Sequence, residues 1–108
     1  MTPTRFAILT ALVNDVLHGA AIARRAEVES AGRVKLWPVT LYRDLDGLEE
    51  DGLIREVTDP EEQPGPGGRH RFFRLTDMGR AALSAEAQGL ERFAGRALAK
   101  LRAREKRA

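Results

Sequence analysis

Two groups of side chains in this chain can form hydrogen bonds with phosphates and with the edges of bases. The first group begins at Pro38 and continues with Thr40, Tyr42 and Arg43, which supply hydroxyl and guanidinium donors. The second group lies on the far side of a stretch rich in proline and glycine. Its members are Arg69, His70 and Arg71. Basic side chains gathered on one short strand suit contacts with phosphates or with a narrow minor groove.

Each of these residues also has a purely structural interpretation. Thr40 and Arg43 are either contact residues or ordinary exposed residues, and Tyr42 either bonds a phosphate or covers the edge of the core. The basic residues of the second group would also suit a solvated hairpin. We expect Trp37 to pack beneath the helix that follows it, and His18 to make a structural hydrogen bond at a helix junction.

The first group lies on a predicted helix over 38–50. Leu41, Leu45 and Leu48 fall at i, i+4 and i+7 and therefore share one apolar face. Pro38 suits the first helical turn, and Gly52 is typical of a residue just past a helix end. We expect the opposite face to approach the major groove of DNA. That face is predicted to carry Thr40, Arg43, Asp44 and Gly47.

The remaining pattern predicts a mainly α chain with a small β-hairpin. We expect helices over 3–15, 19–30 and 77–104, and a very short strand or an extended bridge over 33–37. Strands over 53–58 and 69–75 flank the loop rich in proline and glycine. A hairpin directly after two helices and a turn is a wing, so the pattern indicates a winged helix-turn-helix over 1–76 and a separate final helix over 77–108.

The final helix carries an apolar stripe at helical spacing. Its members are Leu90, Phe93, Ala94, Ala97, Leu98 and Leu101. A helix of this length runs for about 40 Å at 1.5 Å per residue, well past a core built from the first 75 residues. The stripe indicates either a homodimer interface with a second copy or packing within one chain, and we favour the dimer.

Composition excludes several function classes. The chain has 108 residues, 18 Lys and Arg, 16 Asp and Glu and no cysteine, so disulfides and thiolate nucleophiles are absent. Two histidines alone do not make a metal site, and the Gly-Pro-Gly-Gly run lacks the lysine of a phosphate-binding loop. We therefore expect no cofactor, no metal and no enzyme activity. No apolar run approaches the length of a membrane span, and we expect a cytoplasmic protein.

Several blocks of this sequence resemble the PadR family of bacterial transcriptional regulators. The matching blocks span about residues 17–79. They are Leu17-His18-Gly19 with Ile22, then Pro38 to Arg43 with Leu45 and Leu48-Glu49, then Asp51-Gly52-Leu53-Ile54, and last Gly68-Arg69 with Phe72 to Thr76 and Gly79. The length is similar to that of the short branch of the family, which ends in a single helix.

The resemblance implies a homodimeric winged helix-turn-helix repressor that a small effector, such as a phenolic compound or a drug, releases from DNA. By match, Thr40, Tyr42 and Arg43 occupy recognition-helix positions, and 69–71 occupy wing positions. Phe93, the single aromatic residue of the last helix, is a candidate for stacking on an effector at the dimer centre. Asp44 and Asp46 depart from the neutral or basic residues usual on that helix. They would either weaken phosphate contacts or, through Asp44, accept a hydrogen bond from a cytosine amine.

The leading hypothesis is a sequence-specific DNA-binding regulator whose partners are an operator duplex, a second copy and a small effector, with no role at a membrane. The half-sites would lie about one helical turn apart. The alternative is a winged-helix module that binds another protein and not DNA, which the acidic residues of the recognition helix would suit.

Overall fold

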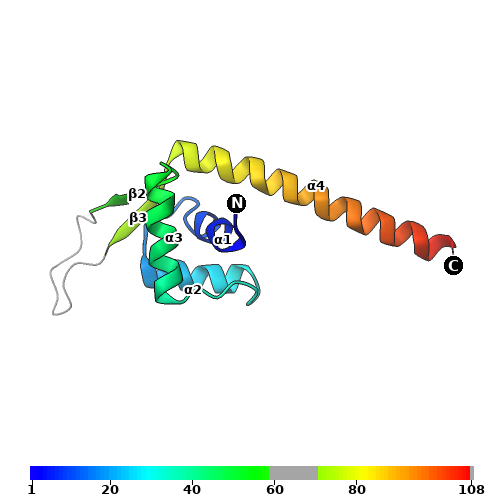
Figure 1. Cartoon of the computed structure of the whole chain (residues 1–108), viewed down its shortest axis with the longest axis horizontal. Helices are drawn as coiled ribbons and strands as arrows, with labels where there is room; N and C mark the ends of the chain where they lie inside the picture. Colours follow the sequence, from blue (N-terminus) through cyan, green and yellow to red (C-terminus); the bar gives the residue numbers. More distant parts are fainter. Residues whose placement is uncertain (59–70, 108) are drawn as a thin grey trace.

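The computed structural model describes residues 1–58 and 71–107, in which three short helices and a small sheet form one body and a long helix extends from it (Figure 1). In chain order the elements are α1 (Pro3–Ala11), β1 (Leu17–His18), α2 (Gly19–Glu29), α3 (Pro38–Glu50), β2 (Ile54–Val57), β3 (Phe72–Leu75) and α4 (Asp77–Arg107). The predicted class, mainly α with a small hairpin and a long final helix, is confirmed.

The sheet is antiparallel with the strand order β1-β3-β2. Phe73 is the centre of it, because it faces Leu17 on one side and Glu56 on the other and its side chain is fully buried. The strand β1 was not predicted. It has two residues, too few to show an alternating pattern, and it pairs through β3, which lies more than 50 residues away in the chain.

The helices pack around one apolar core, and the three leucines of α3 are buried in it as predicted. The helix α1 is shorter than the predicted 3–15. It ends at Ala11, and Asn14 adopts a left-handed backbone conformation (φ 66°) that no α-helix can continue. Gly52 has a φ of 79°, which explains why α3 stops where the glycine was expected to stop it.

Two local hydrogen bonds define the ends of α2. The Nδ1 atom of His18 accepts from the backbone N–H of Ala21 at 3.0 Å, so the predicted structural role of His18 at a helix junction is confirmed. After the helix, the hydroxyl of Ser30 accepts from the backbone N–H of Val34 at 2.9 Å. The segment that leads from there to α3 forms no strand, so the strand predicted as one alternative for 33–37 is wrong. At the end of this segment, Trp37 has an extended backbone (φ −77°, ψ 152°).

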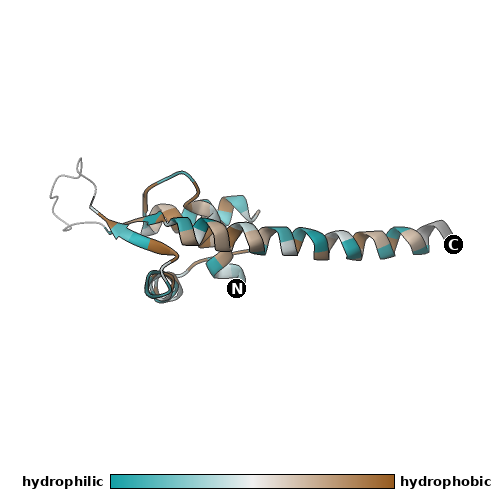
Figure 2. Cartoon of the chain, turned by 90° about the horizontal axis from the view of Figure 1, so that it is seen from above, coloured by the Kyte–Doolittle hydropathy of each residue, from teal (hydrophilic) through white to brown (hydrophobic). Residues whose placement is uncertain are grey.

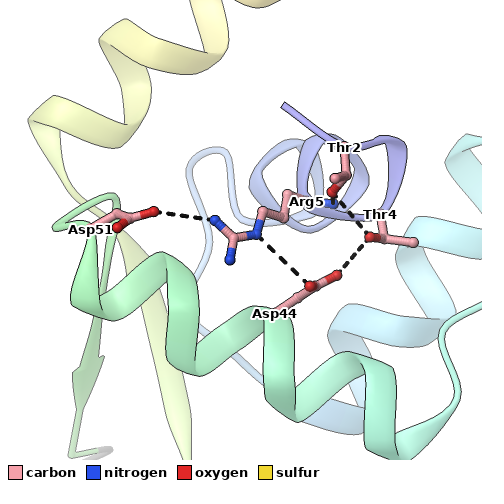
Figure 3. A network of polar contacts seen from close by, with 5 residues as sticks. All are labelled: Thr2, Thr4, Arg5, Asp44 and Asp51. Carbon is pink, nitrogen blue, oxygen red and sulfur yellow. Dashed lines mark hydrogen bonds and ion pairs between the residues drawn. The ribbon is translucent and has the colours of Figure 1, made fainter.

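A polar network fixes how α3 is rotated against α1 (Figure 3). The hydroxyl of Thr4 donates to the carboxylate of Asp44 at 2.6 Å, and the Nε atom of Arg5 lies 3.8 Å from the same carboxylate. The Nη1 atom of Arg5 reaches on to Asp51 at 3.2 Å. Arg5 lies across Gly47, where a Cβ would come within 2.2 Å of its Nη2 atom.

The expected placement of Asp44 and Gly47 is therefore wrong. Both were expected on the face of α3 that approaches DNA, but Asp44 is only 7% exposed and both residues face α1. The reason is that Arg5 and Thr4 supply partners that make a buried carboxylate stable. Neither proposed effect of Asp44 on DNA, repulsion of phosphate or a hydrogen bond with cytosine, is available to it in this position.

The start of α4 is held tightly against the turn between α3 and β2. The hydroxyl of Thr76 donates to the carbonyl of Gly52 at 2.7 Å and accepts from the N–H of Gly79 at 3.0 Å. A Cβ at position 79 would lie 1.9 Å from the carbonyl oxygen of Leu53. Only glycine allows this close approach, which sets the direction in which α4 leaves the body.

Beyond its first turns, α4 projects away from the rest of the molecule (Figure 1), and apolar residues recur along the projecting part (Figure 2). Leu83 is its last buried residue among those described, and every side chain from Glu91 to Arg104 is exposed. Across the residues that the structure describes, no helix is both long and apolar enough to cross a membrane.

We predict that Gly79→Ala lowers the free energy of unfolding by about 1–3 kcal/mol, because a methyl group would be forced into the Leu53 carbonyl. Gly89→Ala on the same helix is the matched control, since nothing lies within 4 Å of its Cβ position. There we expect a gain of about 0.5–1 kcal/mol from the better helix propensity of alanine. Urea unfolding followed by circular dichroism measures both, and equal effects at the two positions would contradict the close contact.

We also predict that Asp44→Ala lowers the free energy of unfolding by about 1–3 kcal/mol, since Thr4 and Arg5 lose their shared acceptor. Glu50→Ala removes an exposed carboxylate from the same helix and should change stability by less than about 0.5 kcal/mol. The same unfolding experiment compares them. A cost at Glu50 as large as that at Asp44 would mean that the network does not stabilise the fold.

Candidate nucleic-acid interface

One face of α3 is left uncovered by the body of the protein. We call it the exposed face of α3. It consists of Val39, Tyr42, Arg43, Asp46 and Glu50. It lies opposite the buried leucines and alongside the start of the hairpin, so a partner that met this face would also meet β2 and β3 (Figure 1).

The structure places the four predicted recognition-helix residues, Pro38, Thr40, Tyr42 and Arg43, in different environments. Arg43 is exposed, and it forms no ion pair with any other side chain in the described part of the chain. Pro38 is exposed at the first helical position. Thr40 is half-buried, because it shares its side of α3 with Asp44, one turn further along.

Tyr42 covers the edge of the core, which is one of the two roles considered for it, and its contact with a phosphate stays a prediction. Its side chain is 40% exposed, and its ring and hydroxyl lie over the first residue of α2. A Cβ at Gly19 would come within 2.7 Å of the Tyr42 hydroxyl. Tyr42 therefore covers the edge of the core and keeps a hydroxyl at the rim of the exposed face.

Two apolar residues at the start of α3 are largely exposed, and for one of them, Trp37, burial had been predicted. Val39 is 80% exposed on the first turn. Trp37 is 66% exposed, with the Lys35 ammonium 5.9 Å from the centre of its ring, so the expectation that it packs beneath the helix is wrong. No periodic signal could have found either residue, since both stand at a helix start where the apolar pattern has not yet repeated.

The hairpin brings one of its described arginines, Arg71, close to the exposed face of α3. Arg69 and His70 lie outside the described residues. Arg74 is exposed on β3, opposite Arg55 on β2. Arg71 comes just before β3, and its guanidinium contacts side chains of two other elements.

Two carboxylates and an aromatic ring contact the guanidinium of Arg71, whose side chain remains 39% exposed. Its Nε and Nη2 atoms donate to the two oxygens of Glu56 at 3.2 and 3.1 Å, and Nη2 lies 3.5 Å from Asp46 on α3. The guanidinium also lies over the ring of Phe73, 5.1 Å from its centre. The hydrogen bonds with Glu56 raise the pKa of Arg71 above its ordinary value, and the charges of Glu56 and Asp46 add to this. The group is therefore fully charged and has two anionic partners.

A second surface feature lies on the other side of the molecule. It is a groove of about 670 Å³ between α1, the end of α2 and α4. Its apolar lining includes Met1, Pro3, Phe6, Ala26, Val34 and Leu90. Leu90 is also the first member of the apolar stripe of α4, whose next member, Phe93, is 74% exposed. The groove and the stripe therefore form one continuous apolar surface.

The sequence was compared with models of protein families and with known proteins, and it matches transcriptional regulators in both comparisons. The family model described as the transcriptional regulator PadR-like family matches residues 8–85, more than half of the chain. A transcriptional regulator of Mycobacterium tuberculosis is 34% identical over 90 residues, which cover 83% of this chain and 78% of that protein. An uncharacterised 37.1 kDa protein of a Streptomyces fradiae transposon is 39% identical over 89 residues, but this chain spans only 23% of its length.

Solved structures share the fold. A PadR family transcription regulator from Clostridium difficile superposes with a TM-score of 0.73 at 24% identity, over 93% of this chain and 98% of that one. The regulator BldR from Sulfolobus solfataricus superposes with the same TM-score at 20% identity, over 92% of this chain and 62% of that one. Both proteins are named as transcriptional regulators. The extent of the family match shows that this chain belongs to the PadR-like family of transcriptional regulators.

Proposed function

We propose that this protein is a sequence-specific DNA-binding repressor that acts as a homodimer. The observation that carries the proposal is the exposed face of α3 beside an arginine-bearing hairpin, on a winged-helix body. An α-helix fits the major groove, and a hairpin beside it can follow the phosphate backbone. The protein would act in the cytoplasm, in the compartment that holds the DNA.

Each residue of the proposed interface has a chemical task. Arg43 suits bidentate hydrogen bonds with a guanine, and Thr40 suits a hydrogen bond at the rim. Tyr42 would bond a phosphate, and Pro38 would let the backbone of the first turn approach the duplex. From the wing, Arg69 and His70 would contact phosphates, and Arg71 completes the proposed set as the wing residue that faces α3.

Val39 adds to the proposed interface a preference for thymine, which the sequence did not indicate. An apolar side chain on the first turn of a recognition helix suits the methyl group of thymine, the one apolar group that base edges present in the major groove. Its 80% exposure supports this role, since no protein neighbour covers it.

The proposed dimer uses residues 77–108. The stripe Leu90, Phe93, Ala94, Ala97, Leu98 and Leu101 is exposed to solvent in one chain, except where Leu90 lines the groove. A second copy of α4 would cover both the stripe and the groove, because the two surfaces are continuous through Leu90. Burying such an apolar surface is favourable in proportion to its area.

Repression and its release by a small effector complete the proposal. Both are implied by the resemblance to the family. Phe93 is the residue of this chain that would stack on an effector at the dimer centre. Its exposed aromatic ring supports this role.

A second candidate function is a module that binds a protein and not DNA. The observation that favours it is the charge of the exposed face of α3, which carries two carboxylates, Asp46 and Glu50, and one guanidinium, Arg43. A basic protein surface would complement this face. Recovery of a protein partner in a pull-down, with DNA binding at background, would support this alternative over the first.

We predict that the protein binds a selected duplex with an affinity that falls steeply as salt rises, because phosphate contacts release counterions. Arg43→Ala should cost about 1–3 kcal/mol on that duplex and little on a scrambled one, since it removes a base contact. Arg92→Ala, at an exposed position on α4, is the matched control and should change neither affinity. Fluorescence anisotropy over a salt series measures all three. Binding that ignores salt, or an equal loss on both duplexes, would contradict base recognition by Arg43.

We predict that the double variant Phe93→Glu with Leu101→Glu is monomeric, because charges replace apolar groups at the centre of the proposed interface. Its affinity for a two-half-site duplex should fall by at least about 100-fold, since the two heads no longer bind as one unit. Arg92→Glu puts the same carboxylate on the other side of α4 and should leave the protein dimeric. Light scattering after gel filtration gives the molecular mass. A wild-type monomer, or a double variant that remains dimeric, would contradict the proposed interface.

A further inference from the structure

The guanidinium of Arg71 links the start of β3 to side chains of β2 and α3. Arg71 precedes β3, Glu56 lies on β2 and Asp46 lies on α3. Both oxygens of Glu56 accept from the guanidinium, and Asp46 approaches the shared Nη2 atom at 3.5 Å. We call Asp46, Glu56 and Arg71 the clamp.

We propose that Arg71 is a positioning residue, whose clamp fixes the angle between α3 and the wing, and that its own charge does not neutralise a DNA phosphate. The inference rests on the proposed DNA-binding function and assigns a role to one member of its interface. It also gives Asp46 a role in that interface, as a carboxylate that holds the wing.

The charge of the clamp argues against a phosphate contact. One guanidinium and two carboxylates carry a net charge of −1, so the group as a whole does not attract a phosphate. Arg43 differs, because it is exposed and has no ion-pair partner among the described side chains. The planar fork of arginine, with two parallel hydrogen bonds to Glu56, also gives the contact a defined direction.

The place of the clamp on α3 argues for a positioning role. The hairpin is joined to α3 by a short turn at Gly52, and next to that turn the backbone N–H of Glu56 donates to the Glu49 carboxylate at 2.9 Å. Asp46 lies almost one turn further back along the helix. The buried side chains of Ile54 and Phe73 and the pairing with β1 already hold the hairpin in the body. The clamp adds a direct contact between α3 and the end of the described strands that lies furthest from Gly52, so it restricts the angle of that end relative to α3.

Two carboxylates of the exposed face of α3 allow a test that separates positioning from charge. Asp46→Asn and Glu50→Gln each remove one negative charge from this face, but only Asp46 contacts Arg71. Charge alone would make both variants bind DNA more tightly. If the clamp positions the wing, Glu50→Gln binds as tightly as the wild type or more tightly, whereas Asp46→Asn binds about two- to fivefold more weakly, the value of an exposed ion pair.

Variants at position 71 give the second contrast. Arg71→Lys keeps the charge but loses the fork, so it should lose affinity nearly as much as Arg71→Ala does. Neither should change the slope of log affinity against log salt. A phosphate ligand at this position would behave differently: lysine would replace it, and alanine would reduce the slope by about one unit. Tighter binding by Asp46→Asn, or a reduced slope for Arg71→Ala, would overturn the inference.

A measurement on the free protein keeps this test separate from the proposed function. Residual dipolar couplings of backbone amides report the angle between α3 and the β2–β3 hairpin without DNA. Asp46→Asn should change that angle or average it, and Glu50→Gln should leave it as in the wild type. An unchanged angle in Asp46→Asn would overturn the clamp. Absence of DNA binding by the wild type would instead overturn the proposed function, while the couplings still decide whether Arg71 positions the wing.

Discussion

The rotation of α3 about its own axis is the constraint on which the rest of the proposed interface depends. Two interactions set it. Leu41, Leu45 and Leu48 bury one face in the core, and Asp44 binds Thr4 and Arg5 on the adjoining side. Apolar burial alone is not directional and would tolerate some rotation, whereas a hydrogen bond of 2.6 Å to a buried carboxylate would not. What remains for a partner is the face that begins at Val39 and continues with Arg43.

The same network connects the two sides of the molecule. Its residues Thr4 and Arg5 lie on the first turn of α1, and Pro3 and Phe6 on that turn line the apolar groove. The helix α1 therefore contacts α3 through polar side chains and lines the groove through apolar ones. In the proposed dimer, the groove is where the second copy would meet this helix.

The sequence predicted the elements of this fold better than their orientations. The leucine spacing was enough to predict α3, because a helix period repeats within a few residues. It did not predict that Asp44 faces inward, since the partners Thr4 and Arg5 lie about 40 residues earlier and only the packed structure brings them near. The two-residue strand β1 was missed for the same reason. Pairing of Arg71 with Asp46 and Glu56 likewise depends on the angle of the hairpin, which no local pattern encodes.

For every residue of the candidate site, contact with DNA stays a prediction, and the structure shows only which of the described residues are exposed. Arg43 and Pro38 are exposed, Tyr42 is divided between core edge and surface, and Arg69 and His70 lie outside the described residues. The exposure of Val39 was not predicted, because a single valine at a helix start carries no periodic pattern. Long-range packing therefore decides which residues of the recognition helix a partner can meet.

Nuclear magnetic resonance mapping of side-chain signals during a DNA titration tests the orientation of α3 most directly. On addition of a selected duplex, we predict large shifts for the methyl groups of Val39 and the guanidinium of Arg43, and unchanged signals for the methyl group of Thr4 and the guanidinium of Arg5 on the opposite side. The reverse result, with shifts at Thr4 and Arg5 and none at Val39 and Arg43, would contradict the account.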